Sequence, residues 1–401
     1  MTDRTDRPAR HSRPNSEPAT VEAHAVTGYE HDGHGSDGYE DDQYDNDQYG
    51  AVAHEGAGTT ERPRTRRRRT WRSALVALGV LGLVLALVVG GGLWFLSSRY
   101  GGNIDRVGDV FAGIDAGSRP AAASPVQDTG ADPVTFLLVG SDTRAVVENG
   151  DLPDARSDAI MLTRIAGDRK HAQVISIPRD SWVDIPGHGK NKINAAYAFG
   201  GPTLLIQTVE QLTGVRIDHY AAISFNGLIQ VTDDLGGVDV VVPETTSNGE
   251  YTFTAGPNHL DGAEARAYVG QRHGLPGGDF DRVKRQQNYL RSMFTKLFSQ
   301  NSFSDPGKLD SLLLAVTSAV AVDDSLGNAD LLSLGYSARG IRPADVAFFT
   351  APVLGTGMEG AASVVYLDTV TDQRMWGYLQ SDSLGQNAGE FTDQALPDVP
   401  R

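Results

Sequence analysis

The stretch that most constrains this chain is an apolar run without a single charge, 74-ALVALGVLGLVLALVVGGGLWFL-96. As a helix it would be about 35 Å long, enough to cross a hydrocarbon core of about 30 Å. Seven arginines lie between Arg62 and Arg72, directly before it. The positive-inside rule then places the N-terminus in the cytoplasm and everything after Arg99 outside. We therefore predict a single-pass protein of the cell membrane, with one transmembrane helix at 73–98 and an extracytoplasmic domain after it.

The segments around this run differ in composition. Residues 1–72 are rich in Asp, Gly, His, Tyr and Gln and have almost no aliphatic run, so we predict a disordered cytoplasmic tail with a polybasic end. Residues 99–132 are rich in Gly, Ala, Asp and Ser and indicate a juxtamembrane stalk. The globular domain is expected over 133–385, followed by a loose C-terminus over 386–401.

Composition excludes several kinds of chemistry. The 401 residues contain no cysteine, which excludes disulfides, thiolate nucleophiles and Cys-based metal sites. The formal charge of −16 argues against a general nucleic-acid binder. The Arg-rich run could suggest a nucleic-acid patch, but beside an apolar run it indicates membrane orientation. We expect no nucleic-acid partner.

The globular part alternates apolar runs of strand length with runs of helical period, which predicts a layered αβα domain with a central mixed sheet. Its first three strands are expected at 135–139, 159–165 and 171–177, and the polar turn 166–170 makes the last two an antiparallel hairpin. Residues 245–260 read as a loop. Later strands are expected at 217–224, 238–244 and 346–352, and helices at 202–213, 226–234, 261–274, 278–300, 311–322, 329–337 and 369–380.

Charged residues follow or precede these first strands. If the first and third strands run parallel in one sheet, the ends of all three converge at one edge, bringing together Asp142, Arg144, Arg156, Asp158, Arg179 and Asp180. Carboxylates beside several arginines suit a divalent cation bridged to a polyphosphate, because Mg²⁺ prefers one or two carboxylates together with phosphate oxygens. Arginines stabilise the charge that develops in phosphoryl transfer.

A second basic segment begins the helix 278–300. Arg282 and Gln286 lie one turn apart in its first turns, where free N–H groups favour an anion. Lys284 and Arg285 fit an exposed helix face. His219 has no partner readable from spacing and is interpreted as a packed core residue.

The chain has no Walker-type loop, no G-x-S-x-G elbow and no H-E-x-x-H. It does contain, in order, LLVGSDTR, ARSDAIML, SIPRDSWVDIP, KINAAYAFGGP, VEQLTGVRIDHY, DLGGVDVVVPE and GDFDRVKRQQ. With these blocks, residues of about 133–300 resemble the LytR-CpsA-Psr family of cell-envelope phosphotransferases, in its actinobacterial type. The resemblance implies an α/β domain that holds a polyprenyl pyrophosphate in an apolar groove. It also implies Mg²⁺-dependent transfer of the linked glycopolymer to peptidoglycan, with formation of a phosphodiester bond.

The resemblance also assigns roles to residues. Asp142, Asp158 and Arg179 would be catalytic, and the two aspartates would face Mg²⁺, or Mn²⁺ in its place. The residues expected to bind pyrophosphate are Arg144, Arg156, Arg179, Lys192, Arg272, Arg282 and Gln286.

One position departs from the family pattern. Where the family reads Tyr-Val-Arg-x-Arg, this chain has 268-YVGQR-272, so that Gly270 replaces a phosphate-binding arginine. Losing such a charge-assisted contact would weaken binding by about 1.5–3 kcal/mol. Arg266, one turn earlier, is a candidate to compensate.

Two other functions fit the same residues. One is a pyrophosphatase acting on polyprenyl or nucleotide pyrophosphates, and the other is a catalytically weak, membrane-tethered regulator that binds lipid pyrophosphate, as Gly270 suggests. The Ala, Val and Gly usage and the Arg-, Gly- and Asp-rich tail favour an actinobacterial source, in which the resemblance implies arabinogalactan on a decaprenyl carrier as the polymer. The general base is left open between Asp142, Asp158 and a metal-bound group.

Overall fold

The structure is a computed structural model that describes residues 98–99, 102–123, 131–141, 157–299 and 306–400. The chain divides into two units, and every described residue belongs to the second, Arg69–Arg401. The predicted tail and the apolar run 74–96 lie outside the described residues. Within the described part of the chain, no helix is both long and apolar enough to cross a membrane.

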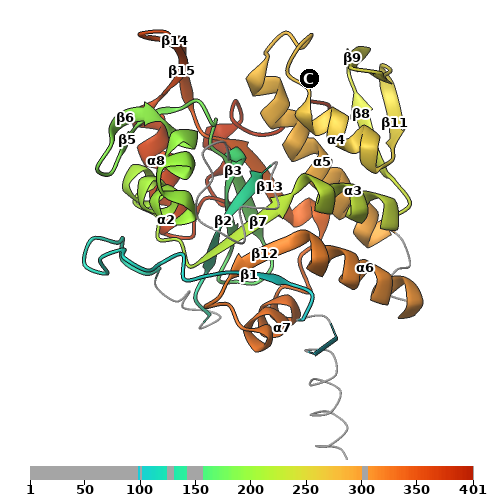
Figure 1. Ribbon diagram of the computed structural model, residues 1–401, viewed down its shortest axis with the longest axis horizontal. Coiled ribbons are helices and arrows are strands. Elements are labelled where there is room, and N and C mark those ends of the chain that lie inside the picture. Colours follow the sequence, from blue (N-terminus) through green and yellow to red (C-terminus); the bar gives the residue numbers. More distant parts are fainter. Residues whose placement is uncertain (1–97, 100–101, 124–130, 142–156, 300–305, 401) are drawn as a thin grey trace, which may run out of the picture. The chain divides into compact units, whose positions relative to one another are not determined.

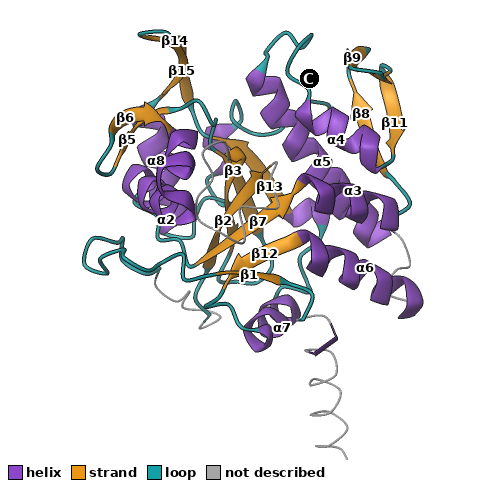
Figure 2. Ribbon diagram, viewed as in Figure 1, coloured by secondary structure: helices purple, strands orange, loops and turns teal. Residues whose placement is uncertain are grey.

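A seven-stranded mixed sheet forms the centre of the described unit (Figures 1 and 2). In spatial order its strands are β1 (Asp105–Val107), β12 (Val320–Asp323), β7 (His219–Ser224), β2 (Val134–Ser141), β3 (Ser157–Ile165), β4 (Ala172–Ser176) and β13 (Val346–Thr350). Strand β3 pairs antiparallel with both β2 and β4, while β2 pairs parallel with β7 and β4 pairs parallel with β13. The predicted hairpin is confirmed, and β2 and β4 run in the same direction.

Helices cover both faces of this sheet because its strands carry apolar side chains on both sides. Leu137 and Val139 of β2 belong to the core that also contains Leu205 of α2 (Ile193–Thr213) and Trp376 of α8 (Thr369–Gln380). Figure 1 shows α2 and α8 together on that side. The intervening Leu138 points to the opposite side. The predicted α/β layering around a mixed sheet is confirmed.

The opposite side of the sheet carries the remaining long helices. They are α3 (Phe225–Asp234), α4 (Gly262–Gly270), α5 (Asp279–Ser299), α6 (Pro306–Ala319) and α7 (Asn328–Ser337). Leu290 of α5 packs with Leu138 and Met161 of the sheet. A second apolar core lies between α3, α4 and α5 and includes Tyr268 and Tyr289.

The segment 245–260 is not the predicted loop. It forms β9 (Thr246–Asn248) and β10 (Tyr251–Phe253), which pair with each other, and β11 (Gly256–Leu260), which pairs with β8 (Val238–Val242). The β9–β10 turn holds Gly249 at φ 62°, a conformation that favours glycine. These strands are short and polar, so they lack the apolar alternation that predicts a strand.

Two helix boundaries also differ from the predictions. The helix expected at 202–213 begins at Ile193 and is kinked, with non-helical backbone at Gly200 and Gly201 just before Pro202. The helix expected at 311–322 ends at Ala319, and the next four residues form β12. Other elements are β5 (Trp182–Ile185), β6 (Gly189–Lys192), β14 (Val353–Glu359), β15 (Ala362–Leu367), η3 (Pro343–Asp345) and η4 (Ala388–Phe391).

The segments predicted to be a stalk and a loose C-terminus both pack against the folded unit. The segment interpreted as a stalk contributes β1, which pairs parallel with β12, and its Arg119 forms a buried ion pair with Glu210 at 2.7 Å. The segment expected to be a loose C-terminus buries Phe391 completely, and its Leu396 N–H donates to the Phe348 carbonyl at 2.9 Å. The folded unit therefore extends beyond 133–385 in both directions.

Candidate active site

The ends of the first strands meet at one edge of the sheet, as the sequence predicts. In β2–β3 pairing, Ser141 lies opposite Ser157, and Ile177, just after β4, donates its N–H to the Ile160 carbonyl at 2.8 Å. This register places Asp158, at the start of β3, beside Arg179, which follows β4. The Arg179 Nη1 donates to Asp158 Oδ1.

A short turn after β4 fixes Arg179. Ser181 donates its N–H and its hydroxyl to the Pro178 carbonyl, at 2.9 and 2.6 Å, and is completely buried. The Asn194 N–H, in the first turn of α2, donates to the Arg179 carbonyl at 3.1 Å. Lys192 forms an ion pair with Asp180 at 3.0 Å. The backbone around Arg179 is thus tied to α2, which fixes the position from which its side chain extends.

The first turn of α5 completes an ion-pair cluster of four residues, Asp158, Arg179, Asp279 and Arg282. The Arg282 Nη2 lies 2.9 Å from Asp279 Oδ1, and the Arg179 Nη2 lies 3.4 Å from the same oxygen. The Arg282 Nη1 lies 3.9 Å from Asp158 Oδ1. Two carboxylates and two guanidinium groups therefore interlock across strands and helix. Sequence reasoning missed Asp279, although its i, i+3 spacing from Arg282 in GDFDR is a readable signal.

Both arginines of the cluster have a buried N–H group without a hydrogen-bond partner among the described residues. Burial lowers the pKa of Arg282, and the nearby Arg179 and Arg272 lower it further, whereas Asp279 and Asp158 raise it. The Nε atoms of Arg179 and Arg282 are buried and have no hydrogen-bond partner among the described residues. Leaving such donors unpaired costs about 1–3 kcal/mol each. An anion that reorients either guanidinium group would relieve this penalty.

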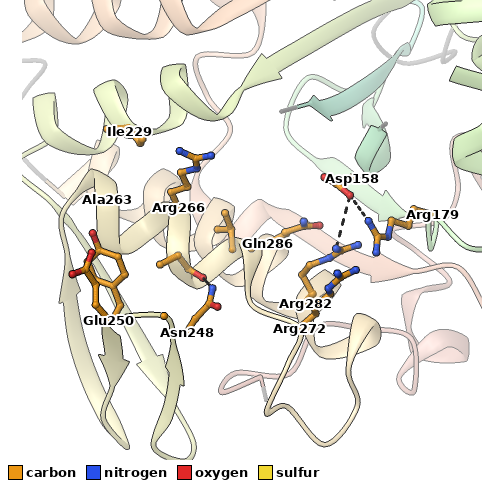
Figure 3. A pocket seen from close by; sticks show the side chains of 15 residues that line it. Asp158, Arg179, Ile229, Asn248, Glu250, Ala263, Arg266, Arg272, Arg282 and Gln286 are labelled. Atoms are coloured by element: carbon orange, nitrogen blue, oxygen red, sulfur yellow. Dashed lines mark hydrogen bonds and ion pairs between the residues drawn. The ribbon is translucent and has the colours of Figure 1, made fainter. Parts of the chain in front are cut away.

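A polar pocket of about 870 Å³ opens beside the cluster (Figure 3). Asp158, Arg179, Arg272, Arg282 and Gln286 line it, together with Ile229, Asn248, Gly249, Glu250, Tyr251, Ala263, Arg266, Ala267, Val269 and Gly270. Lys192 is not among the lining residues. Arg266 lines the same pocket as Gly270, and in Figure 3 it lies on the other side of Gln286 from the cluster.

An apolar pocket of about 70 Å³ adjoins the polar one. Both are lined by Val269 and Gln286. Its other lining residues are Leu138, Val139, Gly140, Ala159, Met161, Ile223, Ser224, Leu228, Tyr289 and Leu290. Gln286 is 8% exposed and marks the boundary between an ionic and an apolar environment.

The described residues contain six of the predicted site residues. Asp158, Arg179, Arg272, Arg282 and Gln286 come together in the polar pocket. Lys192 does not line it, but pairs with Asp180, whose Oδ2 lies 4.0 Å from Arg179 Nε. The others, Asp142, Arg144 and Arg156, lie outside the described residues.

The carboxylates at this site can be compared with the ligands that Mg²⁺ binds in proteins. No group of three or more His, Asp or Glu side chains suitable for a metal occurs in the described part of the chain. Mg²⁺ typically takes only one or two carboxylates and fills its shell with water and phosphate oxygens. Asp158, whose side chain is 19% exposed at the polar pocket, fits that role as one ligand.

Two side-chain predictions can be checked directly. Arg285, expected on an exposed face, is 1% exposed, because its guanidinium group lies over the Tyr268 ring at 4.7 Å. His219 is half-buried, with its Nδ1 3.2 Å from Asp323 Oδ2, and does not line the polar pocket.

Comparisons with known proteins bear on this arrangement. The chain matches the model of the LytR_cpsA_psr family over residues 114–380. It is 32% identical over 346 residues to the cell wall biosynthesis protein LcpA of Corynebacterium glutamicum, covering 74% of this chain and 63% of LcpA. It is 35% identical over 206 residues to the polyisoprenyl-teichoic acid–peptidoglycan teichoic acid transferase TagU of Enterococcus faecalis, covering 51% and 66%. The chain thus spans slightly less than two thirds of each relative.

A solved structure agrees with the fold. The crystal structure of Bacillus subtilis TagV is 27% identical and covers 63% of this chain and 97% of TagV, with a TM-score of 0.53. Its likeness supports the layered α/β architecture around the mixed sheet.

Proposed function

Because the chain belongs to the LytR-CpsA-Psr family, we propose that it transfers a glycopolymer from a polyprenyl-pyrophosphate carrier to peptidoglycan. The observation that carries this proposal is the ion-pair cluster of Asp158, Arg179, Asp279 and Arg282, placed beside the apolar pocket. A lipid diphosphate needs both environments next to each other, and Gln286 lies at their boundary. TagU, a relative, is named for a transfer of the same kind.

In the proposed reaction, a hydroxyl of peptidoglycan forms a new P–O bond to the phosphorus on the polymer side of the diphosphate. The bridging P–O bond breaks, polyprenyl monophosphate leaves and the hydroxyl proton is released. Arg179, Arg272 and Arg282 would bind the diphosphate oxygens and stabilise the charge that develops on them. Because carboxylates already hold Arg179 and Arg282 beside the pocket, the substrate needs only to reorient their guanidinium groups and not to bring them there.

The proposed cofactor is Mg²⁺, or Mn²⁺ in its place. Asp158 would hold it, together with Asp142. When bound, the ion would neutralise charge on the diphosphate oxygens. Asp158 is also paired with Arg179, which fixes its carboxylate at the edge of the polar pocket.

The prenyl chain is assigned to the apolar pocket. A volume of about 70 Å³ matches only about two water molecules. A prenyl chain must therefore widen this pocket, and the flexible Met161 and Leu290 in its wall allow such repacking.

The cellular setting is also part of the proposal. We place the catalytic domain outside the cell membrane, anchored by the apolar run 74–96, where lipid-linked polymer and peptidoglycan are accessible. Arabinogalactan is the proposed polymer, on the basis of the actinobacterial composition of the chain. LcpA of Corynebacterium glutamicum, which is similar to this chain, is a cell wall biosynthesis protein.

The test is transfer by purified full-length protein given lipid-linked polymer, Mg²⁺ and peptidoglycan. We expect Arg179→Ala to lower the transfer rate by roughly 10- to 150-fold, the equivalent of one charge-assisted contact of about 1.5–3 kcal/mol. Arg291→Ala is the matched control, because Arg291 instead donates to the Pro397 and Asp398 carbonyls. Equal transfer by both variants would refute the assignment.

Product analysis separates the two alternatives. Release of phosphate-capped polymer without wall attachment would make the protein a pyrophosphatase. Binding of the lipid diphosphate with neither product would make it a regulator, which Gly270 in the polar pocket favours.

A further inference from the structure

Arg285 is a buried cation without an ion-pair partner. It is 1% exposed, and none of the described carboxylates forms an ion pair with it. Burying an unpaired charge typically costs several kcal/mol, and burial lowers the pKa of this guanidinium group. An apolar side chain would fill the same space without that penalty. The presence of an arginine at this buried position must therefore be explained by the groups to which its guanidinium donates hydrogen bonds.

The guanidinium group joins separate segments of the chain. Its Nη1 donates to Gln271 Oε1 at 2.6 Å, and its Nη2 donates to Thr246 Oγ1 at 2.8 Å. The rings of Tyr268 and Phe253 lie beside it, with centroids 4.7 and 5.7 Å from Cζ. This aromatic environment partly compensates the lost hydration through cation–π attraction.

Gln271 extends the connection to the walls of the polar pocket. Its Nε2 donates to the Ser247 carbonyl at 2.9 Å and to the His273 carbonyl at 3.2 Å. Arg272, which lines the pocket, lies between Gln271 and His273 in sequence. Ser247 directly precedes the β9–β10 turn, whose residues 248–251 line the same pocket.

We infer that Arg285 is the positioning residue of the polar pocket. Through Gln271 and Thr246 it fixes Arg272 and the β9–β10 wall relative to α5, which carries Arg282 and Gln286. Arg285 itself does not line the pocket. Of the pocket residues that it fixes, Arg272 is the one with a positive charge for a diphosphate, so the effect of Arg285 on ligand binding is transmitted through Arg272. The inference rests on the proposed function only for the identity of the ligand.

The test uses full-length protein and geranylgeranyl diphosphate with Mg²⁺, with affinity measured by isothermal titration. Arg285→Met keeps the length of the side chain but removes the charge and both donors, so we expect about a tenfold loss of affinity. Arg285→Lys keeps the charge without the planar fork and should recover part of the loss. Arg291→Ala, on the same helix, should bind like the wild type.

A double-mutant cycle distinguishes positioning from a general loss of stability. In an Arg272→Ala background, Arg285→Met should change affinity less than twofold, because its effect passes through Arg272. The same tenfold loss in both backgrounds would overturn the inference. So would wild-type affinity in Arg285→Met.

Hydrogen exchange provides a readout that does not depend on the ligand. In Arg285→Met, and in Arg285→Lys if Arg285→Met fails to fold, backbone amides at 247–249 and 272–273 should exchange faster while those of β2–β4 are unchanged. Unchanged exchange at 247–249 and 272–273 would overturn the inference. If the wild-type protein does not bind the diphosphate, the proposed function is refuted. The exchange experiment then still decides whether Arg285 positions these segments.

Discussion

Replacing Gly270 by arginine is expected to tighten the binding of a polyprenyl diphosphate. Gly270 is the last residue of α4 and lines the polar pocket with Arg272 and Arg282. A Cβ at Gly270 would meet no heavy atom within 4 Å, so a side chain can begin there without displacing a neighbour. The new guanidinium group would add a cation to the pocket that Arg179 and Arg282 also line.

The expected magnitude follows from the contacts. One charge-assisted hydrogen bond contributes about 1.5–3 kcal/mol, which corresponds to roughly 10- to 150-fold in affinity. Repulsion from Arg272 and Arg282 in the empty pocket opposes part of this gain, so we expect the lower end of that range. The folded state itself should not suffer, because arginine is favoured over glycine in a helix by up to about 1 kcal/mol and a cation suits its C-terminal turn.

The assay is titration of full-length protein with geranylgeranyl diphosphate at low and high salt. The control Gly270→Gln has similar size and helix propensity but no charge, so it separates charge from added contact. We expect tighter binding for Gly270→Arg alone, with a gain that shrinks as salt rises. Equal affinities for the wild type and Gly270→Arg would refute the claim that a cation at position 270 contacts the diphosphate.

Three further changes test other parts of the structure. Ala159→Phe should fill the apolar pocket and lower affinity for geranylgeranyl diphosphate at least tenfold, while affinity for inorganic pyrophosphate, measured in parallel, stays unchanged. Burial raises the pKa of Asp372 to about 7 in the folded protein. As the pH rises from about 4 to 7, the carboxyl group loses its proton in the unfolded state before it does so in the folded state, so the free energy of unfolding falls. The gain in melting temperature from Asp372→Asn should therefore grow over that interval, and a constant difference would contradict it. Phe391→Ala should lower the free energy of unfolding by about 3–5 kcal/mol in urea denaturation, since this ring is fully buried; a loss below 1 kcal/mol would mean that the C-terminal segment does not stabilise the fold.

The sequence predicted the part of the fold that depends on local signals. Long apolar strands separated by a polar turn gave the β3–β4 hairpin, and from it followed the meeting of Asp158 with Arg179. Helical spacing with a glycine-rich start gave α5 and placed Arg282 and Gln286 in its first turns. These features need only the periodicity of neighbouring residues and the direction of paired strands.

The remaining features depend on contacts between distant residues. β1 and β12 are three and four residues long, and they become strands through pairing at the edge of the sheet. Arg285 reads as a surface residue, because nothing in its helix shows that Tyr268 and Phe253 cover it. Likewise, Phe391 is one aromatic residue in a polar segment, and its burial against Tyr378 follows only from the tertiary structure.

A crystal structure of the protein with geranylgeranyl diphosphate tests the central claim most directly. We predict diphosphate oxygens within about 2.7–3.2 Å of guanidinium nitrogens of Arg179 and Arg282, with the prenyl chain between Leu138 and Leu290. A diphosphate bound elsewhere, with the ion-pair cluster unchanged and in contact with no ligand atom, would contradict the account.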